Sequence, residues 1–543
     1  MTASTMSFQD LTIGAVITHA GRFHGDTEIV SVETDRSVAR STWGGVAANA
    51  RRLASALHKA GIAQGDRCAT IAWNNLRHLE IYFGVSGGAM VCHTINPRLA
   101  PEQIAYIVGH ASDRVLFFDK TFLPLIVALR DHLKSVELFV LMGARDPEVE
   151  AKLPGVVFYD EFVAGGDADY AFPAHDETLP SSLCYTSGTT GNPKGVMYTH
   201  RSTILHAIGS NQPDGMNICG RDSVMPVVPM FHVSAWGTPY VAAIAGARLV
   251  MPGPGLDGAS LTDLIETEKV TISFGVPTIW MGLLAEMKAR GMTGSAMKRT
   301  IVGGSAMPPS MFAEFRDLFG IELIHAWGMT ETSPLGTANQ LKSKHEALSP
   351  AERDELRLSQ GRPPFGVDLR IVDAEGNELP RDGKTEGELH IRGHWVVGTY
   401  FGQNRPATDA DGWFDTGDVA TIDPDGFMVI RDRSKDIIKS GGEWISSVEL
   451  ENIAIGHPMI ANAAAIAARH EKWDERPVIV AVKSGEVTEE ELKALFASRL
   501  PGWQVPDRVI FVDELPLGAT GKVLKTKLRA DFGDCLIGAD ASG

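Results

Sequence analysis

The chain has 543 residues, of which 44% are hydrophobic and 22% charged, and it carries a formal net charge of −17 at pH 7. This length suffices for about two to four domain-sized units, and the negative charge would repel a nucleic-acid backbone, so we expect no nucleic-acid partner. No stretch approaches the roughly 18 consecutive apolar residues of a membrane helix, so we expect no integral membrane contact.

The N-terminal segment and the cysteines indicate where the protein works. The first ten residues, MTASTMSFQD, contain neither the basic region nor the apolar core of a secretory signal, so we expect a cytoplasmic location. The five cysteines are odd in number, scattered and without CxxC spacing. This pattern argues against a disulfide framework or a structural zinc site.

Helical and strand patterns alternate along the first half of the chain. Residues Val46 to Ala60 have the spacing of an amphipathic helix, and short apolar runs predict strands. The predicted strands are Cys68 to Trp73, Val115 to Phe118, Leu249 to Met251 and Ile272 to Gly275. The alternation is typical of α/β layers with mostly parallel sheets.

A loop rich in small and hydroxylated residues runs from Tyr185 to Val196. Its sequence, YTSGTTGNPKGV, holds three glycines, four Ser or Thr hydroxyls and one lysine. Glycines let backbone N–H groups approach an anion, while hydroxyls and a lysine add donors and positive charge. The loop therefore suits a polyphosphate, although an ordinary surface turn can have the same composition.

Two other nucleotide motifs fail on their spacing. The Gly-Lys pairs at Gly383 and Gly521 have Glu378 and Pro516 where a Walker A loop needs its first glycine. A GxGxxG pattern begins at Gly253 but lacks the acidic residue expected about twenty positions later, so we interpret it as a tight βα turn.

The last third of the chain indicates a hairpin and a separate small domain. The segment from Asp373 to Gly387 has the composition of a hairpin turn region, and the polar DRSKD from Asp432 to Asp436 marks a boundary. Beyond it lie two apolar strand-like segments and a helix that runs to Leu500, with Thr488 as N-cap and Glu491 completing a capping box. This pattern predicts a small α+β domain.

Four further clusters follow the loop in order: WGMTE from Trp327, WFDTGD from Trp413, DRSKDIIKSGGEWI from Asp432 and PLGATGK from Pro516. With the loop, they resemble the motifs of the class I adenylate-forming enzymes, the superfamily of acyl-CoA synthetases, luciferases and peptide-synthetase adenylation domains. The resemblance covers nearly the whole chain. It implies a large N-terminal ATP- and acyl-binding domain of layered α/β sheets, residues 1–434, and a small mobile α+β C-terminal domain, residues 435–543.

The resemblance also implies an ATP-dependent acid–CoA ligase that uses Mg²⁺. Thr330 matches the residue that contacts the α-phosphate, Glu331 and Thr186 the metal site, and Asp418 the residue that contacts both ribose hydroxyls. Trp327 stands where the family more often has tyrosine and would stack on adenine, although it could be a core residue. The residues implied for ATP are Thr186, Ser187, Gly188, Thr189, Thr190, Gly191, Lys194, Gly304, Ser305, Ala306, His325, Ala326, Trp327, Asp418, Ile430 and Arg433.

The resemblance further implies a reaction in two steps, adenylation of the carboxylate and then transfer of the acyl group to the thiol of coenzyme A. Each step is implied to use a different face of the C-terminal domain. Lys522 matches the lysine that bridges the α-phosphate and the carboxylate during adenylation, and Lys435 occupies the hinge position. Lys439 would act in the thioester step with coenzyme A. The other residues implied for that face are Gly441, Gly442, Glu443 and Trp444.

The acyl-binding residues are implied to determine the substrate. His232 resembles the gate between the thiol tunnel and the acyl site. Trp236 resembles a wall of the acyl pocket that would favour short or medium chains, and Gly303 and Gly304 would form the thin side of that pocket. His232 could instead be a core histidine, and Trp236 could be structural.

The C-terminal end of the sequence and two motif contexts narrow the branch of the superfamily. The last motif is not succeeded by a carrier-protein segment, so we expect a free-standing CoA ligase. The contexts SGGEWISSVELEN and HVSAWG are similar to the medium-chain acyl-CoA ligase branch, which includes 3-methylmercaptopropionate-CoA ligases. We expect a homodimer. A luciferase-like oxidative enzyme and a non-catalytic acyl or nucleotide sensor remain alternatives.

Overall fold

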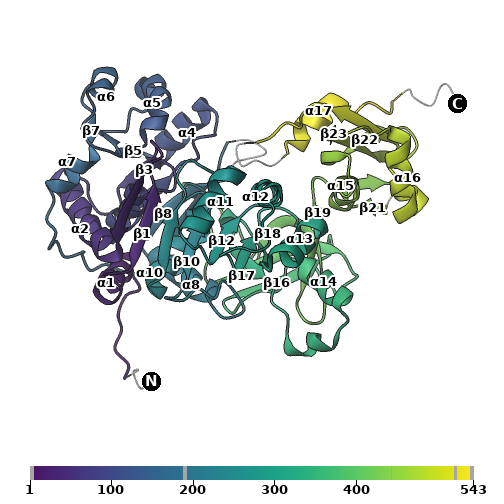
Figure 1. The fold of residues 1–543 in the computed structure, drawn as a ribbon, viewed down its shortest axis with the longest axis horizontal. Helices are drawn as coiled ribbons and strands as arrows, with labels where there is room; N and C mark the ends of the chain where they lie inside the picture. The colour runs from purple at the N-terminus through teal and green to yellow at the C-terminus, as the bar shows by residue number, and fades with distance from the viewer. Residues whose placement is uncertain (1–4, 187–191, 442, 519–522, 538–543) are drawn as a thin grey trace. The chain divides into compact units, whose positions relative to one another are not determined.

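The computed structural model describes residues 5–186, 192–441, 443–518 and 523–537. The predictions on Ser187 to Gly191, Gly442 and Lys522 fall outside these ranges. The chain divides into two compact units, Met1–Asp368 with Arg392–Phe414, and Leu369–Ile391 with Asp415–Gly543 (Figure 1). Within the described ranges, no helix is both long and apolar enough to cross a bilayer.

The first unit contains two mostly parallel sheets. In the first sheet every neighbouring pair is parallel except the last, which forms an antiparallel hairpin. Its order is β7 (Val157–Phe158), β6 (Leu138–Leu141), β5 (Val115–Phe118), β3 (Arg67–Ile71), β4 (Val91–Thr94), β8 (Pro180–Tyr185) and β9 (Gly195–Thr199).

The second sheet has a parallel centre and antiparallel edges. Its order is β15 (Leu335–Ala338), β14 (Glu322–Gly328), β13 (Arg299–Val302), β12 (Ile272–Gly275), β10 (Ser223–Pro226), β11 (Arg248–Met251), β1 (Glu28–Val32) and β2 (Val38–Thr42). The parallel α/β architecture predicted from the alternating patterns is therefore confirmed.

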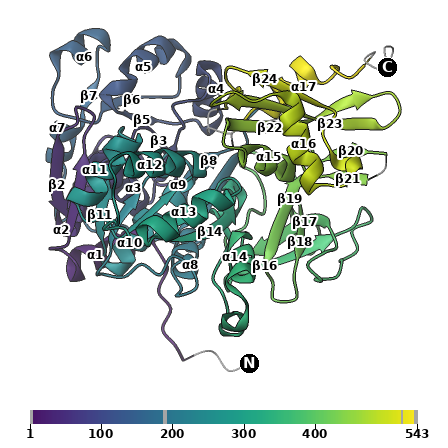
Figure 2. The same cartoon turned by 45° about the vertical axis from the view of Figure 1, so that its right-hand side comes forward.

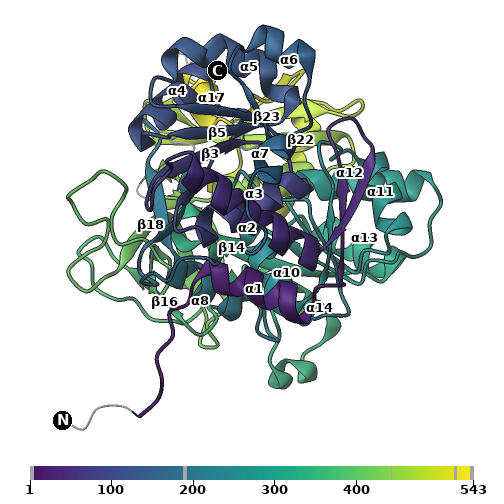
Figure 3. The same cartoon turned by 90° about the vertical axis from the view of Figure 1, so that its left-hand side faces the viewer.

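Helices cover both sheets of the first unit, and Figure 3 shows α1, α2 and α3 side by side. The helices are α1 (Ile13–Phe23), α2 (Trp43–Lys59), α3 (Leu76–Gly87), α4 (Pro101–Ala111), α5 (Leu123–Leu129), α6 (Pro147–Lys152), α7 (Tyr159–Ala164), α8 (His200–Ser210), α9 (Val233–Trp236), α10 (Thr238–Ala245), α11 (Gly258–Thr267), α12 (Pro277–Ala289), α13 (Pro309–Phe319) and α14 (Pro350–Leu358). The helix predicted from Val46 begins three residues earlier, because Thr42 caps it by accepting a hydrogen bond from the Gly45 N–H.

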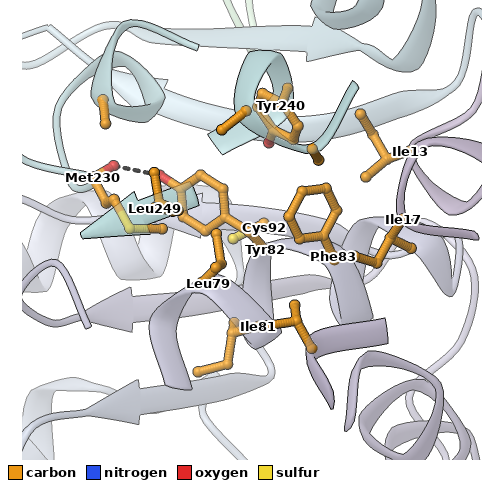
Figure 4. Close-up of a cluster of buried hydrophobic side chains, with 14 of the residues drawn as sticks. Ile13, Ile17, Leu79, Ile81, Tyr82, Phe83, Cys92, Met230, Tyr240 and Leu249 are labelled. Carbon is orange, nitrogen blue, oxygen red and sulfur yellow. Dashed lines mark hydrogen bonds between the residues drawn. The ribbon is translucent and has the colours of Figure 1, made fainter. Parts of the chain in front are cut away.

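One hydrophobic core joins α1, α3 and α10 to strands of both sheets. Figure 4 shows Tyr82 and Phe83 of α3 in one cluster with Tyr240 of α10, Cys92 of the first sheet and Leu249 of the second. The Tyr82 hydroxyl is fully buried and donates a hydrogen bond to the Met230 carbonyl, which satisfies it. This bond anchors α3 to the segment that follows β10, where two predicted site residues lie.

The second unit contains two sheets of its own, visible in Figure 2. One is ordered β16 (Val367–Val372), β17 (Gly387–Gly393), β18 (Phe414–Ile422) and β19 (Met428–Arg433). The other is ordered β21 (Glu443–Ile445), β20 (Ile438–Ser440), β23 (Asp474–Lys483) and β22 (Ile460–His470), with β24 (Arg508–Val512) also on β23. Its helices are α15 (Ser447–Ile455), α16 (Glu489–Arg499) and α17 (Lys525–Phe532).

The predicted small α+β domain is present within this unit. Thr488 caps α16 and forms the predicted capping box with Glu491. The predicted boundary between residues 434 and 435 falls between β19 and β20, inside the second unit.

Candidate active site

Predicted acyl-site residues lie at one edge of the second sheet. Strands β10, β12, β13 and β14 are parallel, so their carboxyl ends meet at a common edge, which is where α/β sheets bind ligands. His232 and Trp236 follow β10, and Gly303 and Gly304 follow β13. Val302 pairs with His325 of β14, so the segment after β13 adjoins His325, Ala326 and Trp327.

The segment after β10 is a left-handed helical turn. Val233, Ser234, Ala235 and Trp236 have φ values of 46°, 51°, 48° and 58°. A left-handed conformation costs non-glycine residues roughly 1–2 kcal/mol each, so the surrounding packing must impose this turn. His232 precedes it, is half-buried, and donates its N–H to the Pro229 carbonyl at 3.0 Å.

The turn places the indole of Trp236 against Gly303. A Cβ atom on Gly303 would lie 3.1 Å from Cη2 of Trp236 and 2.9 Å from the Ala326 carbonyl oxygen. A larger residue at this position would therefore displace the indole. Gly304 has a φ of 83°, a conformation that favours glycine, whereas the neighbouring Ser305 is exposed and Ala306 half-buried.

The predicted adenine residues on β14 are buried. Trp327 is 8% exposed and Ala326 is equally buried. His325 donates from Nδ1 to the Leu358 carbonyl at 2.8 Å, because a carbonyl can only accept. Burial lowers the pKa of His325, which keeps the imidazole neutral.

A second buried histidine, His206 of α8, lies against Gly237, the residue that follows the left-handed turn. Its Nε2 accepts from the Leu335 N–H at 3.2 Å, and a Cβ on Gly237 would lie 2.9 Å from its Nδ1. Burial lowers the pKa of His206 to about 3. Because the folded pKa lies below the unfolded value, the residue contributes stability above about pH 6.5 that is lost as the pH falls toward 3.

We expect His206→Gln to flatten the pH dependence of stability. Between pH 6 and 4 the wild type should lose up to about 1.4 kcal/mol of unfolding free energy per pH unit through this residue, and the variant should not. Urea unfolding at pH 7, 6, 5 and 4 measures the difference, with the exposed His19→Gln as control. Parallel curves for wild type and His206→Gln would contradict the expectation.

Thr186 and Lys194, the described ends of the loop predicted to bind phosphates, lie directly after β8 and directly before β9. Thr186 donates its N–H to the Lys194 carbonyl at 2.9 Å, and the Lys194 N–H donates to Oγ1 of Thr186 at 3.3 Å. In the same hairpin, the Tyr198 hydroxyl donates to the Thr330 carbonyl at 2.7 Å. The hairpin is thus tied to the WGMTE motif, in which Thr330 and Glu331 are both 7% exposed.

Tyr400 contacts both Glu331 and Lys194, the charged residues predicted to lie beside the ATP phosphates. Its hydroxyl donates to Oε1 of Glu331 at 2.8 Å, and Nζ of Lys194 lies 4.8 Å from its ring centroid. Sequence reasoning missed this residue, because Tyr400 is 69 positions from Glu331 and carries no local signal of a site.

In the second unit, the predicted ribose residues lie opposite each other on β18 and β19. Asp418 pairs with Arg433 in the strand register, and its Oδ1 lies 2.9 Å from Nε of Arg433. The carboxylate is 2% exposed and the guanidinium side chain 39% exposed. Ile430 lies on β19 and pairs with Ala420.

The residues predicted for the thioester face surround the β20–β21 turn. Lys439 and Trp444 are paired across the two strands, and such pairs point to one face of a sheet. Trp444 is 40% exposed, and Glu443 is also exposed. Gly441 has a φ of 61° and donates its N–H to the Trp473 carbonyl at 2.9 Å.

The predicted hinge residue lies just before this face. Burial lowers the pKa of Lys435, although neighbouring Asp436 opposes the shift. Asp436 is in turn held by Arg529 of α17 at 2.7 Å.

Two sets of described side chains are candidates for binding a metal ion. Glu331 supplies a buried carboxylate that accepts a hydrogen bond from the Tyr400 phenol, and a carboxylate oxygen is a ligand that fits a hard cation bound together with phosphates. Separately, Glu388, His390 and Asp415 have ligand atoms within 4.8 Å of one another. A guanidinium nitrogen of Arg370 lies 3.4 Å from His390, which disfavours a cation there, and we assign no metal to this cluster.

Comparison with known proteins identifies the family. A model described as AMP-binding enzyme matches residues 17–401, and one described as AMP-binding enzyme C-terminal domain matches residues 449–522. The chain belongs to the AMP-binding enzyme family. It is 59% identical to a 3-methylmercaptopropionyl-CoA ligase of Ruegeria pomeroyi, over 98% of this chain and 99% of the relative. It is 57% identical to a medium-chain-fatty-acid–CoA ligase of Ectopseudomonas oleovorans, over 99% of each.

A solved structure shares the fold of this AMP-binding enzyme. It is an o-succinylbenzoate coenzyme A synthetase of Bacillus subtilis in complex with ATP and magnesium ion, with a TM-score of 0.79 and 22% identity over 95% of this chain and 99% of that one. The adenylate-forming fold predicted from the motifs is confirmed. Within the family the chain is an AMP-forming acyl-CoA ligase, and ATP and coenzyme A are substrates of such ligases.

Proposed function

We propose that this ligase activates a short- to medium-chain carboxylate, with 3-methylmercaptopropionate as the leading candidate. The proposal rests on the 59% identity to the 3-methylmercaptopropionyl-CoA ligase of Ruegeria pomeroyi, which extends over nearly the full length of both chains. The indole of Trp236 packed on Gly303 supports it, since a large side chain at the edge of the second sheet would limit acyl length.

The first half-reaction joins the carboxylate to the α-phosphorus of ATP and expels pyrophosphate. It needs donors and positive charge around the phosphates rather than a protein nucleophile. Lys194 and the loop from Thr186 to Gly191 would hold the β- and γ-phosphates, and Thr330 the α-phosphate. Bound Mg²⁺, held by Glu331 with Thr186, would neutralise phosphate charge. Lys522 would bridge the α-phosphate and the carboxylate.

In the second half-reaction the thiolate of coenzyme A displaces AMP from the acyl-adenylate. We assign this step to a rotation of residues 435–543 about Lys435, which brings Lys439, Gly441, Gly442, Glu443 and Trp444 to the acyl group. His232 would gate the route of the thiol. The adenine side would be lined by Gly304, Ser305, Ala306, His325, Ala326 and Trp327, and the ribose side by Asp418, Ile430 and Arg433.

We also propose a cytoplasmic location, because ATP and coenzyme A are both supplied in the cytoplasm, and a homodimeric assembly. Light scattering coupled to gel filtration tests the assembly. A mass near one chain, 58.5 kDa, would contradict the dimer.

A panel of acids tests the function. Release of AMP and pyrophosphate should require both an acid and ATP, and 3-methylmercaptopropionate or a medium-chain acid should give the highest kcat/KM with coenzyme A present. Oxidation or light without coenzyme A would indicate the luciferase-like alternative. ATP binding without pyrophosphate release for every acid would indicate a sensor and would contradict the proposal.

We expect Asp418→Ala to weaken ATP binding by about 1–3 kcal/mol, because the ribose hydroxyls lose a charged acceptor. Asp418→Asn keeps the packing against β19 and should have a smaller effect. Equilibrium titration with a non-hydrolysable ATP analogue measures both variants. An unchanged titration for Asp418→Ala would remove this residue from the ribose site.

A further inference from the structure

The segment from Val397 to Phe401 connects the β8–β9 hairpin to the WGMTE motif through its backbone. The Val397 N–H donates to the Glu331 carbonyl at 2.8 Å. The Phe401 N–H donates to the Gly195 carbonyl, also at 2.8 Å. Gly195 directly follows Lys194, so the segment is fixed at one end to the backbone of Glu331, the predicted metal ligand, and at the other to the residue next to the predicted phosphate-binding lysine.

Tyr400 lies between these two anchors, and its side chain contacts both charged groups. The phenol donates to Oε1 of Glu331 at 2.8 Å, and the ring faces Nζ of Lys194 at 4.8 Å from its centroid. The second distance is within the range of a cation–π contact.

The hydroxyl is not needed to fix the Glu331 backbone, because Val397 already does so. What the hydroxyl contacts is one carboxylate oxygen. Carboxylates that bind metals are commonly held by such hydrogen bonds from neighbouring side chains, and losing one typically costs about 10–100-fold in metal affinity or activity. The ring in turn restricts a long, flexible ammonium side chain to one region.

We propose that Tyr400 is a positioning residue that orients the Glu331 carboxylate for Mg²⁺ and the Lys194 ammonium for the ATP phosphates. The proposal rests on the proposed function, because it takes the roles of Glu331 and Lys194 from it. It assigns separate roles to two parts of this side chain. The hydroxyl acts on the metal ligand, and the ring acts on the phosphate-binding lysine.

Two substitutions separate the hydroxyl from the ring. Tyr400→Phe keeps the ring facing Lys194 and removes the hydrogen bond to Glu331. We expect the dissociation constant for Mn²⁺, measured by electron paramagnetic resonance with enzyme and a non-hydrolysable ATP analogue, to rise about tenfold. The Mg²⁺ concentration for half-maximal pyrophosphate release should rise in parallel, while the KM for the acid stays unchanged.

Tyr400→Leu removes the ring as well. It should show the same metal defect and, in addition, weaker binding of the ATP analogue without metal, because Lys194 loses its cation–π contact. Tyr170→Phe is the matched control. It removes another half-buried hydroxyl, hydrogen-bonded to His58 in the same unit, and should change neither measurement.

A double-mutant comparison tests the link to Glu331. In a Glu331→Ala background, Tyr400→Phe should have no further effect on Mn²⁺ binding, because its partner is already absent. The same fold-change in both backgrounds would overturn the proposal. So would wild-type metal binding by Tyr400→Phe, or an equal loss of acid, ATP and metal binding together with a lowered Tm. Failure of the proposed function is distinguishable, because the wild type itself would then release no pyrophosphate with any acid.

Discussion

Lys522→Ala is expected to reduce acyl-adenylate formation about 10²- to 10³-fold, because a cation aimed at the developing charge is lost in the first half-reaction. The same variant should still convert supplied acyl-adenylate and coenzyme A into the thioester. Lys439→Ala should show the converse defect, since Lys439 lies on the β20–β21 face that we assign to the thiol step. Pyrophosphate release and thioester formation from synthetic acyl-adenylate measure the two steps separately.

The control for this pair is Lys493→Ala. Lys493 forms a partly exposed ion pair with Glu489 on α16, and ion pairs that remain accessible to solvent contribute little. Both half-reactions should remain at wild-type rates. If Lys522→Ala and Lys439→Ala each impair both half-reactions to the same degree, the assignment of two faces to two steps is wrong.

Trp236→Ala is expected to move the preference toward longer acids. Removing the indole leaves room for several methylenes, each worth up to ~0.8 kcal/mol of burial, so relative kcat/KM for long over short acids should rise about tenfold or more. Short acids should react more slowly, because they no longer pack closely enough to align the carboxylate with the α-phosphorus. The measurement is kcat/KM over straight-chain acids and 3-methylmercaptopropionate.

Two further variants check the interpretation of this result. Trp236→Phe removes less volume and should shift the preference less. Trp503→Ala removes a 43% exposed indole in the second unit and should leave the rank order unchanged. A uniform fall in kcat/KM for Trp236→Ala, with the order of acids preserved, would show that the indole supports the fold and does not determine which chain length is preferred.

Much of the fold could be predicted because its signals are local. The predicted strand from Val115 to Phe118 is β5, and the run from Ile272 to Gly275 is β12. Thr488 caps α16 as expected, because a capping box is formed by residues three positions apart. The GxGxxG pattern is indeed a turn between β11 and α11, in which Gly253 has a φ of 61°.

The geometry of the site depended on long-range packing that local patterns do not report. In HVSAWG only Gly237 favours a positive φ, yet four residues before it adopt the left-handed conformation. The residues on either side of that turn are held by distant helices, because the Met230 carbonyl accepts from Tyr82 of α3 and the ring of His206 of α8 lies against Gly237. Tyr400 was missed for the same reason, since its partners Lys194 and Glu331 come from distant segments.

The fate of the carboxylate oxygens tests most directly the central claim, that the enzyme activates its acid as an acyl-adenylate. With an acid labelled in both carboxylate oxygens with ¹⁸O, attack on the α-phosphorus followed by thiol displacement leaves one labelled oxygen on AMP. Mass spectrometry of the products with coenzyme A present should therefore find ¹⁸O in AMP and none in pyrophosphate. Unlabelled AMP, or label in inorganic phosphate, would contradict activation through an acyl-adenylate.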